Sequence, residues 1–173
     1  TVETFAAELQ AVLDARGRLR EFTARIDERP DDPAPRRQRM LWAFECSRWR
    51  MILEDGDAMI PKLDLEKPGD RDLFEELAVH YARANALAGK RDACIRLMER
   101  YVTLFPSGEQ IHSARQILGF SYDQNGEKSN AGDCYAAILR AGSKSRSASN
   151  AQKFFKDNPE EAKRFDPKTF EPK

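Results

Sequence analysis

The sequence predicts an all-α protein. Apolar residues recur at intervals of three and four along most of the 173 residues, and only 9 glycines and 9 prolines interrupt them. This period places apolar side chains along one face of an α-helix. The balance of 40% hydrophobic and 34% charged residues also suits helices with one buried and one solvated face. The length fits one domain with its own core, which we expect over residues 1–165, followed by a tail over 166–173.

Residues 1–64 predict irregular helical hairpins. The first helix begins with one apolar stripe, made of Val2, Phe5, Leu9, Val12 and Leu13. We expect Gly17 to interrupt this helix, and a second stripe over residues 19–26 to end before Pro30.

The stretch from 36 to 54 is apolar on two faces. A helix of that kind is usually buried between neighbours, so it predicts one central core helix. We expect a turn at Asp55–Gly56 and a brief helix near 57–64 to follow it.

The rest of the chain shows the helical period most clearly. Four helices are predicted, over residues 71–87, 90–105, 109–124 and 128–141. Gly89, the Pro106–Gly108 segment and Asn125–Gly126 separate them. Residues 147–165 predict short C-terminal helices that cap the last of these.

Residues 75–108 and 112–145 share one spacing of small and large residues. The first unit has Ala82, Gly89, Cys94 and Met98, and the second has Gly119, Gly126, Ala131 and Tyr135. Two helices approach closely where a small side chain faces a large one, so the small residues predict the contact points of two antiparallel helical hairpins. The glycine between the helices accepts the left-handed conformation that ends the first one. Each hairpin needs a neighbour to cover its outer face, so we expect the hairpins to stack.

These residues resemble the tetratricopeptide repeat in a divergent bacterial form. That repeat has 34 residues, whereas here the distance from Gly89 to Gly126 is 126 − 89 = 37 residues, which indicates an insertion. The resemblance covers residues 75–145 and implies a short right-handed solenoid of antiparallel hairpins. It also implies a non-catalytic protein–protein interaction scaffold that binds a peptide or partner helix in its concave groove. The alternative is an irregular helical bundle in which the spacing is coincidental.

The resemblance also indicates which residues would line the groove. By their places in the motif they are Glu76, Val79, Arg83 and Leu87 from one hairpin and Ser113, Gln116, Phe120 and Asp123 from the next. Phe120 and Arg83 are the strongest anchor candidates, because aromatic and arginine side chains dominate interface energetics. The alternative is that the segment 147–165 folds over this groove and makes Phe120 part of the core.

Little in the sequence suggests chemistry. His80 and His112 are the only histidines, and neither has another ligand type at metal-binding spacing. No nucleophile elbow, phosphate-binding loop, dinucleotide-binding glycine motif or zinc-protease motif occurs. We therefore expect no catalytic residues, no metal and no cofactor, and we do not expect an enzyme. The three cysteines lack metal or redox spacing and are predicted to be small buried residues.

Two other functions stay open. The chain begins with Thr1 rather than Met, which indicates a processed or truncated product and favours an accessory or oligomerisation domain of a larger envelope or enzyme-fused protein. A phosphate- or nucleic-acid-binding surface would use the basic patch of Arg140, Lys144, Arg146, Lys153 and Lys156. A net charge near zero speaks against nucleic acid as the main partner.

Membrane insertion is not expected, because no apolar run is long enough to span a bilayer. The compartment stays open: the resemblance points to a bacterial periplasm or envelope, and the odd cysteine count points to a reducing cytoplasm.

Overall fold

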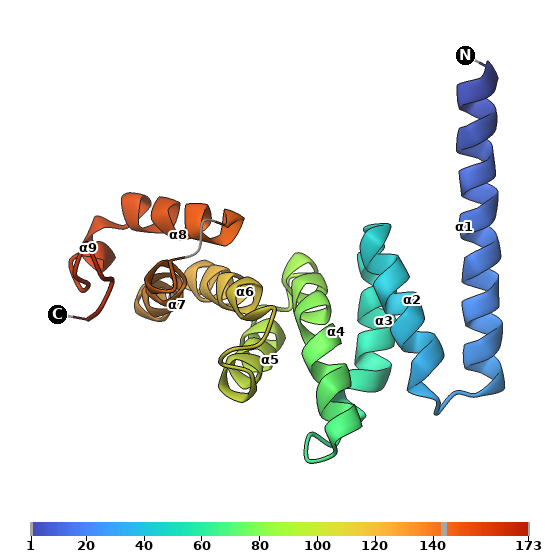
Figure 1. Cartoon of the computed structure of the whole chain (residues 1–173), viewed down its shortest axis with the longest axis horizontal. Coiled ribbons are helices and arrows are strands. Elements are labelled where there is room, and N and C mark those ends of the chain that lie inside the picture. Colours follow the sequence, from blue (N-terminus) through green and yellow to red (C-terminus); the bar gives the residue numbers. More distant parts are fainter. Residues whose placement is uncertain (1, 143–144, 173) are drawn as a thin grey trace. The chain divides into compact units, whose positions relative to one another are not determined.

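The described part of the chain, residues 2–142 and 145–172 of a computed structural model, is built from helices (Figure 1). Within these ranges there are nine α-helices and one 3₁₀ helix and no strand, so the all-α prediction is confirmed. The elements are α1 (Val2–Glu28), α2 (Pro33–Glu45), α3 (Trp49–Met59), η1 (Ile60–Lys62), α4 (Pro68–Leu87), α5 (Arg91–Leu104), α6 (Ile111–Gln124), α7 (Lys128–Arg140), α8 (Arg146–Asp157) and α9 (Pro159–Ala162).

Backbone contacts divide the chain into two compact units, residues 1–63 and 64–173. We call the first unit 1 and the second unit 2. The single domain over residues 1–165 stays a prediction.

Helix α1 is continuous, so the predicted break at Gly17 is wrong. A glycine in a helix interior costs only about 1 kcal/mol relative to alanine, and a Cβ added at Gly17 would meet no atom within 4 Å. Neither backbone strain nor a neighbour therefore forces the helix to end there. The last turns of α1 pack on α2, where the Phe22 and Trp42 rings lie 6.0 Å apart and Ile26 is buried.

The predicted central helix over 36–54 is also wrong, because the structure has two helices there. Asp32 caps α2 by accepting a hydrogen bond from the Ala34 amide at 2.9 Å. The chain then reverses at Ser47, which has a φ of 54°, and α3 packs back on α2. The two helices thus share a core, with Met40 of α2 and Ile52 of α3 fully buried.

The turn expected at Asp55–Gly56 does not form, because both residues lie buried within α3. The expected helix near 57–64 is replaced by the end of α3 and the 3₁₀ turn η1.

In unit 2, helices α4 to α7 fall where the sequence predicts them. Helix α4 contacts α5 and α6, and α6 contacts α5 and α7. Gly89 and Gly126 have φ values of 75° and 83°, the left-handed conformation expected at these helix ends. A Cβ on Gly119 would lie 3.1 Å from the Tyr135 ring, so a residue without a side chain lets α6 approach α7 at this point.

The C-terminal part of unit 2 is formed by α8 and α9. Helix α8 contacts α6 and α7, and α9 contacts α7 and α8. Residues 143 and 144, at the end of the predicted repeat 112–145, lie outside the described residues. The predicted tail is held against the helices: the Arg140 Nε lies 2.9 Å from a Glu171 carboxylate oxygen, and the Phe155 and Phe170 rings stack at 5.9 Å.

Candidate functional site

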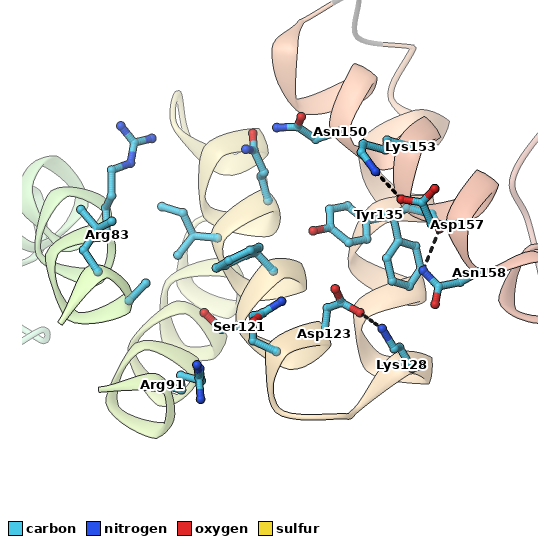
Figure 2. A pocket seen from close by; sticks show the side chains of 17 residues that line it. Arg83, Arg91, Ser121, Asp123, Lys128, Tyr135, Asn150, Lys153, Asp157 and Asn158 are labelled. Atoms are coloured by element: carbon cyan, nitrogen blue, oxygen red, sulfur yellow. Dashed lines mark hydrogen bonds and ion pairs between the residues drawn. The ribbon is translucent and has the colours of Figure 1, made fainter. Parts of the chain in front are cut away.

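A groove of about 920 Å³ lies in unit 2 between α4, α6 and α8 (Figure 2). We call it the α4–α6–α8 groove. Residues from the starts of α5 and α7 and the middle of α7 complete its walls. It is lined by Arg83, Ala86, Leu87, Arg91, Gln116, Ile117, Phe120, Ser121, Asp123, Gln124, Lys128, Tyr135, Asn150, Lys153, Phe154, Asp157 and Asn158.

Two large apolar side chains are open to solvent in this groove. Phe120 is 50% exposed and Leu87 is 61% exposed. The buried Tyr135 and Phe154 rings also line the groove and pack against each other at 4.6 Å. Covering an exposed side chain of this size is worth about 1–2 kcal/mol, at roughly 25 cal/mol per Å² of apolar surface. The groove therefore offers apolar surface that a ligand can bury.

The charges of the groove are unbalanced. Its lining contains four basic residues, Arg83, Arg91, Lys128 and Lys153, and two acidic ones, Asp123 and Asp157, so its net charge is 4 − 2 = +2. Figure 2 shows Arg83 and Arg91 on one side and the ion pairs Asp123–Lys128 and Lys153–Asp157 on the other. The lining as a whole thus carries excess positive charge, which favours an anionic group.

Arg83 also affects its neighbour on α4. Burial lowers the pKa of His80, and the positive charge of Arg83 lowers it further, while Glu76 acts in the opposite direction.

Five of the eight residues predicted from the repeat line this groove, namely Arg83, Leu87, Gln116, Phe120 and Asp123. The other three, Glu76, Val79 and Ser113, do not line it. Val79 is only 2% exposed and belongs to the core, so its placement in the groove was wrong. Arg83 and Leu87, in the second half of α4, line the groove, whereas Val79 is buried between the packed helices.

Helix α8 forms one wall of the groove and does not fill it. The alternative in which segment 147–165 makes Phe120 a core residue is therefore wrong, since that side chain is half exposed. The Ser147 hydroxyl donates a hydrogen bond to the Gln116 Oε1 at 2.6 Å, which ties the start of α8 to α6.

Asn150, Phe154 and Asp157 of α8 line the groove. The sequence suggests a 147–165 segment over the groove only as an alternative, and it singles out none of these three residues as lining, because no spacing in the repeats relates α8 to α6.

The Ser121 hydroxyl in the groove wall is buried and already has a partner within the protein. The buried Ser121 hydroxyl donates to the Cys94 sulfur at 3.2 Å, and burial raises the pKa of that thiol, which keeps it protonated. Among the residues that the structure describes, no three histidine, cysteine or acidic side chains are grouped to hold a metal ion. Of the cysteines, Cys46 is exposed, so its predicted burial was wrong.

The basic patch near α8 is partly neutralised. Arg140 pairs with Glu171 and Lys153 pairs with Asp157, and Lys144 lies outside the described residues. These pairs reduce the positive charge available for a phosphate backbone.

The fold and the groove thus define an all-helical protein with a concave, partly apolar and basic surface. Comparison with protein-family models, with curated proteins and with solved structures finds no match to the chain. Over residues 2–142 and 145–172, none of the helices combines the length and the apolar character needed to cross a membrane.

Proposed function

We propose that this chain is a non-catalytic interaction scaffold whose α4–α6–α8 groove binds a segment of another protein. The observation that carries the proposal is the pair of half-exposed apolar side chains, Phe120 and Leu87, inside a concave surface with excess positive charge. Exposed aromatic side chains beside arginines are the groups that most often provide the binding energy of protein interfaces.

The groove chemistry indicates the kind of segment. Its apolar floor would take a large apolar side chain of the partner, covering Phe120 and Leu87. The neighbouring Arg83 and Arg91 would pair with a carboxylate of the same segment. We therefore infer a partner segment in which an acidic residue lies near an aromatic or aliphatic one. A volume of about 920 Å³ holds a few side chains rather than a whole domain.

We also propose that unit 2 is a tetratricopeptide-like solenoid. The left-handed glycines Gly89 and Gly126 and the close approach at Gly119 agree with the steric pattern of that repeat. The small residues Cys94 and Ala131 are fully buried at matching places in α5 and α7. In such an arrangement, α4 and α6 would be the inner helices of successive hairpins and would line the concave face.

The proposal can be tested by selecting random peptides of about 12 residues on the immobilised chain and measuring their affinity by fluorescence anisotropy. We expect the selected peptides to combine acidic and large apolar residues. Phe120→Ala and Arg83→Ala should each weaken binding by about tenfold or more, the loss typical of interface anchors.

Matched controls exist elsewhere in the chain. Leu13 is 50% exposed, like Phe120, but lies in unit 1. Arg96 is an exposed arginine of α5 outside the groove. Leu13→Ala and Arg96→Ala should leave peptide affinity unchanged. Equal losses in the groove and control variants, or selected peptides without acidic residues, would contradict the proposal.

A further inference from the structure

A second recess, of about 440 Å³, lies in unit 2 between the start of α4 and the second half of α5. We call it the α4–α5 recess. Its volume is in the range of small-molecule sites, and it shares no lining residue with the α4–α6–α8 groove. Three arginines line it, Arg71 from α4 and Arg96 and Arg100 from α5. Since Arg96 and Arg100 are four residues apart, they lie on one face of α5.

Two of these guanidinium groups are held in place by aromatic rings. The Arg71 guanidinium carbon lies 5.2 Å from the centre of the Phe105 ring, and its Nη2 donates to the Leu104 carbonyl at 3.1 Å. The Arg100 guanidinium carbon lies 5.6 Å from the centre of the buried Phe74 ring. A ring orients a guanidinium group without neutralising its charge. Most of the N–H donors of these arginines therefore stay available to a ligand.

Ion pairs do not cancel the positive charge of the α4–α5 recess. In the part of the chain that the structure describes, none of the three arginines forms an ion pair with a carboxylate. Glu66 and Glu99 also line the recess, so its net charge is 3 − 2 = +1. The Glu99 carboxylate accepts a hydrogen bond from the Tyr122 hydroxyl and is thus engaged with α6. The arginines therefore favour an anion from outside the chain.

We propose that the α4–α5 recess binds the phosphate group of a phosphate monoester. A phosphate carries up to two charges and three strong acceptor oxygens, and guanidinium groups bind such oxygens in a planar, two-point geometry. A carboxylate has one charge and two oxygens, so it serves three guanidinium groups less well. Because the rings already orient two of the arginines, binding immobilises fewer free side chains. Leu65 and Leu104 also line the recess and would contact the carbon skeleton of the ester.

Nuclear magnetic resonance of the arginine side chains tests the proposal, because each Nε–Hε signal reports on one guanidinium group. Phenyl phosphate, a soluble monoester, would be titrated into the full ¹⁵N-labelled chain at about 0.15 M ionic strength. We expect the signals of Arg71, Arg96 and Arg100 to shift together, with a dissociation constant of about 1 mM or lower. Benzoate, which carries a carboxylate on the same ring, should bind about tenfold more weakly.

Three substitutions should affect phenyl phosphate binding in different ways. Arg96→Gln removes a guanidinium group and should weaken binding by about tenfold. Glu66→Gln removes a carboxylate from the recess and should strengthen binding by about twofold or more. Arg91→Gln is the matched control, since Arg91 is an exposed arginine of the same helix outside the recess, and it should leave the affinity unchanged. All three side chains are exposed, so the variants should keep their helical circular dichroism.

Vesicles containing about 10% phosphatidic acid distinguish two sources of the phosphate group. Vesicle binding that Arg96→Gln weakens assigns the recess to a lipid headgroup, whereas binding of phenyl phosphate alone assigns it to a soluble monoester. The proposal is overturned if neither probe binds with a dissociation constant below about 20 mM. It is also overturned if Arg96→Gln and Arg91→Gln weaken binding equally, or if benzoate binds as tightly as phenyl phosphate. The α4–α6–α8 groove has no part in these measurements, so their outcome is independent of peptide binding there.

Discussion

Arg39 and Asp55 form a two-point ion pair inside unit 1. The Arg39 Nε and Nη2 donate to the two carboxylate oxygens of Asp55 at 2.7 and 2.8 Å. Asp55 is fully buried, and Arg36 donates to it at 3.1 Å from the edge of the pair. The pair joins α2 to α3, so the reversal of the chain at Ser47 brings together two charges from separate helices.

Breaking this pair should destabilise unit 1. Asp55→Ala leaves the Arg39 guanidinium buried without its main partner, which typically costs about 3–5 kcal/mol. The double variant Arg39→Met with Asp55→Leu removes both charges and should lose much less stability than the sum of the single variants. Urea unfolding followed by Trp42 and Trp49 fluorescence measures both. If the loss of stability in the double variant equals the sum of the losses in the two single variants, the two side chains do not act as a pair.

Two glycines should respond in opposite directions to substitution. Gly119→Val should destabilise unit 2 by about 1–3 kcal/mol, because its side chain would collide with Tyr135 and Cys134 across the α6–α7 contact. Gly17→Ala should stabilise α1 by up to about 1 kcal/mol, because its helical site is open. Thermal unfolding monitored by circular dichroism measures both. A tolerated valine at position 119 would contradict the close approach of the two helices.

The three thiols should differ in reactivity. Cys46 is exposed, Cys94 is buried, and burial together with Asp133 raises the pKa of Cys134 to about 12. The thiolate is the reactive form, so a disulfide reagent at neutral pH should modify Cys46 quickly and the other two only after unfolding. Cys46→Ser should abolish the fast phase. A fast phase that persists in this variant would show that a second thiol is accessible.

His80 should make unit 2 less stable in mild acid. Its pKa in the folded chain is lowered by burial and by Arg83. The unfolded chain, with a histidine pKa of about 6.5, therefore takes up the proton first. The stabilising contribution is complete above about pH 6.5 and falls as the pH drops toward the lowered pKa. His80→Gln should flatten the dependence of the unfolding free energy on pH in this range, and an unchanged dependence would contradict this assignment.

How well the sequence predicts each part depends on the signals at its boundaries. Helices α4 to α7 are separated by Gly89, Gly126 and a proline-containing segment, so their positions could be predicted. The reversal between α2 and α3 has no glycine or proline, since Ser47 itself adopts the positive φ of 54°. The burial of Asp55 could not be predicted either, because its partner lies 55 − 39 = 16 residues away in another helix.

The groove was predictable only in part, for a related reason. Its α4 and α6 residues follow from repeat positions, whereas α8 reaches the groove through tertiary contacts such as Ser147 with Gln116. The basic side of the groove includes Arg91, which the repeat comparison did not assign to it.

Binding in the α4–α6–α8 groove is the central claim, and nuclear magnetic resonance tests it most directly. A peptide selected on the chain would be titrated into the ¹⁵N-labelled protein. We predict that the largest amide shift changes fall at residues around Arg83, Leu87, Phe120 and Lys153, which line the groove on three helices. Shift changes confined to other surfaces, or unaltered by Phe120→Ala, would contradict the account.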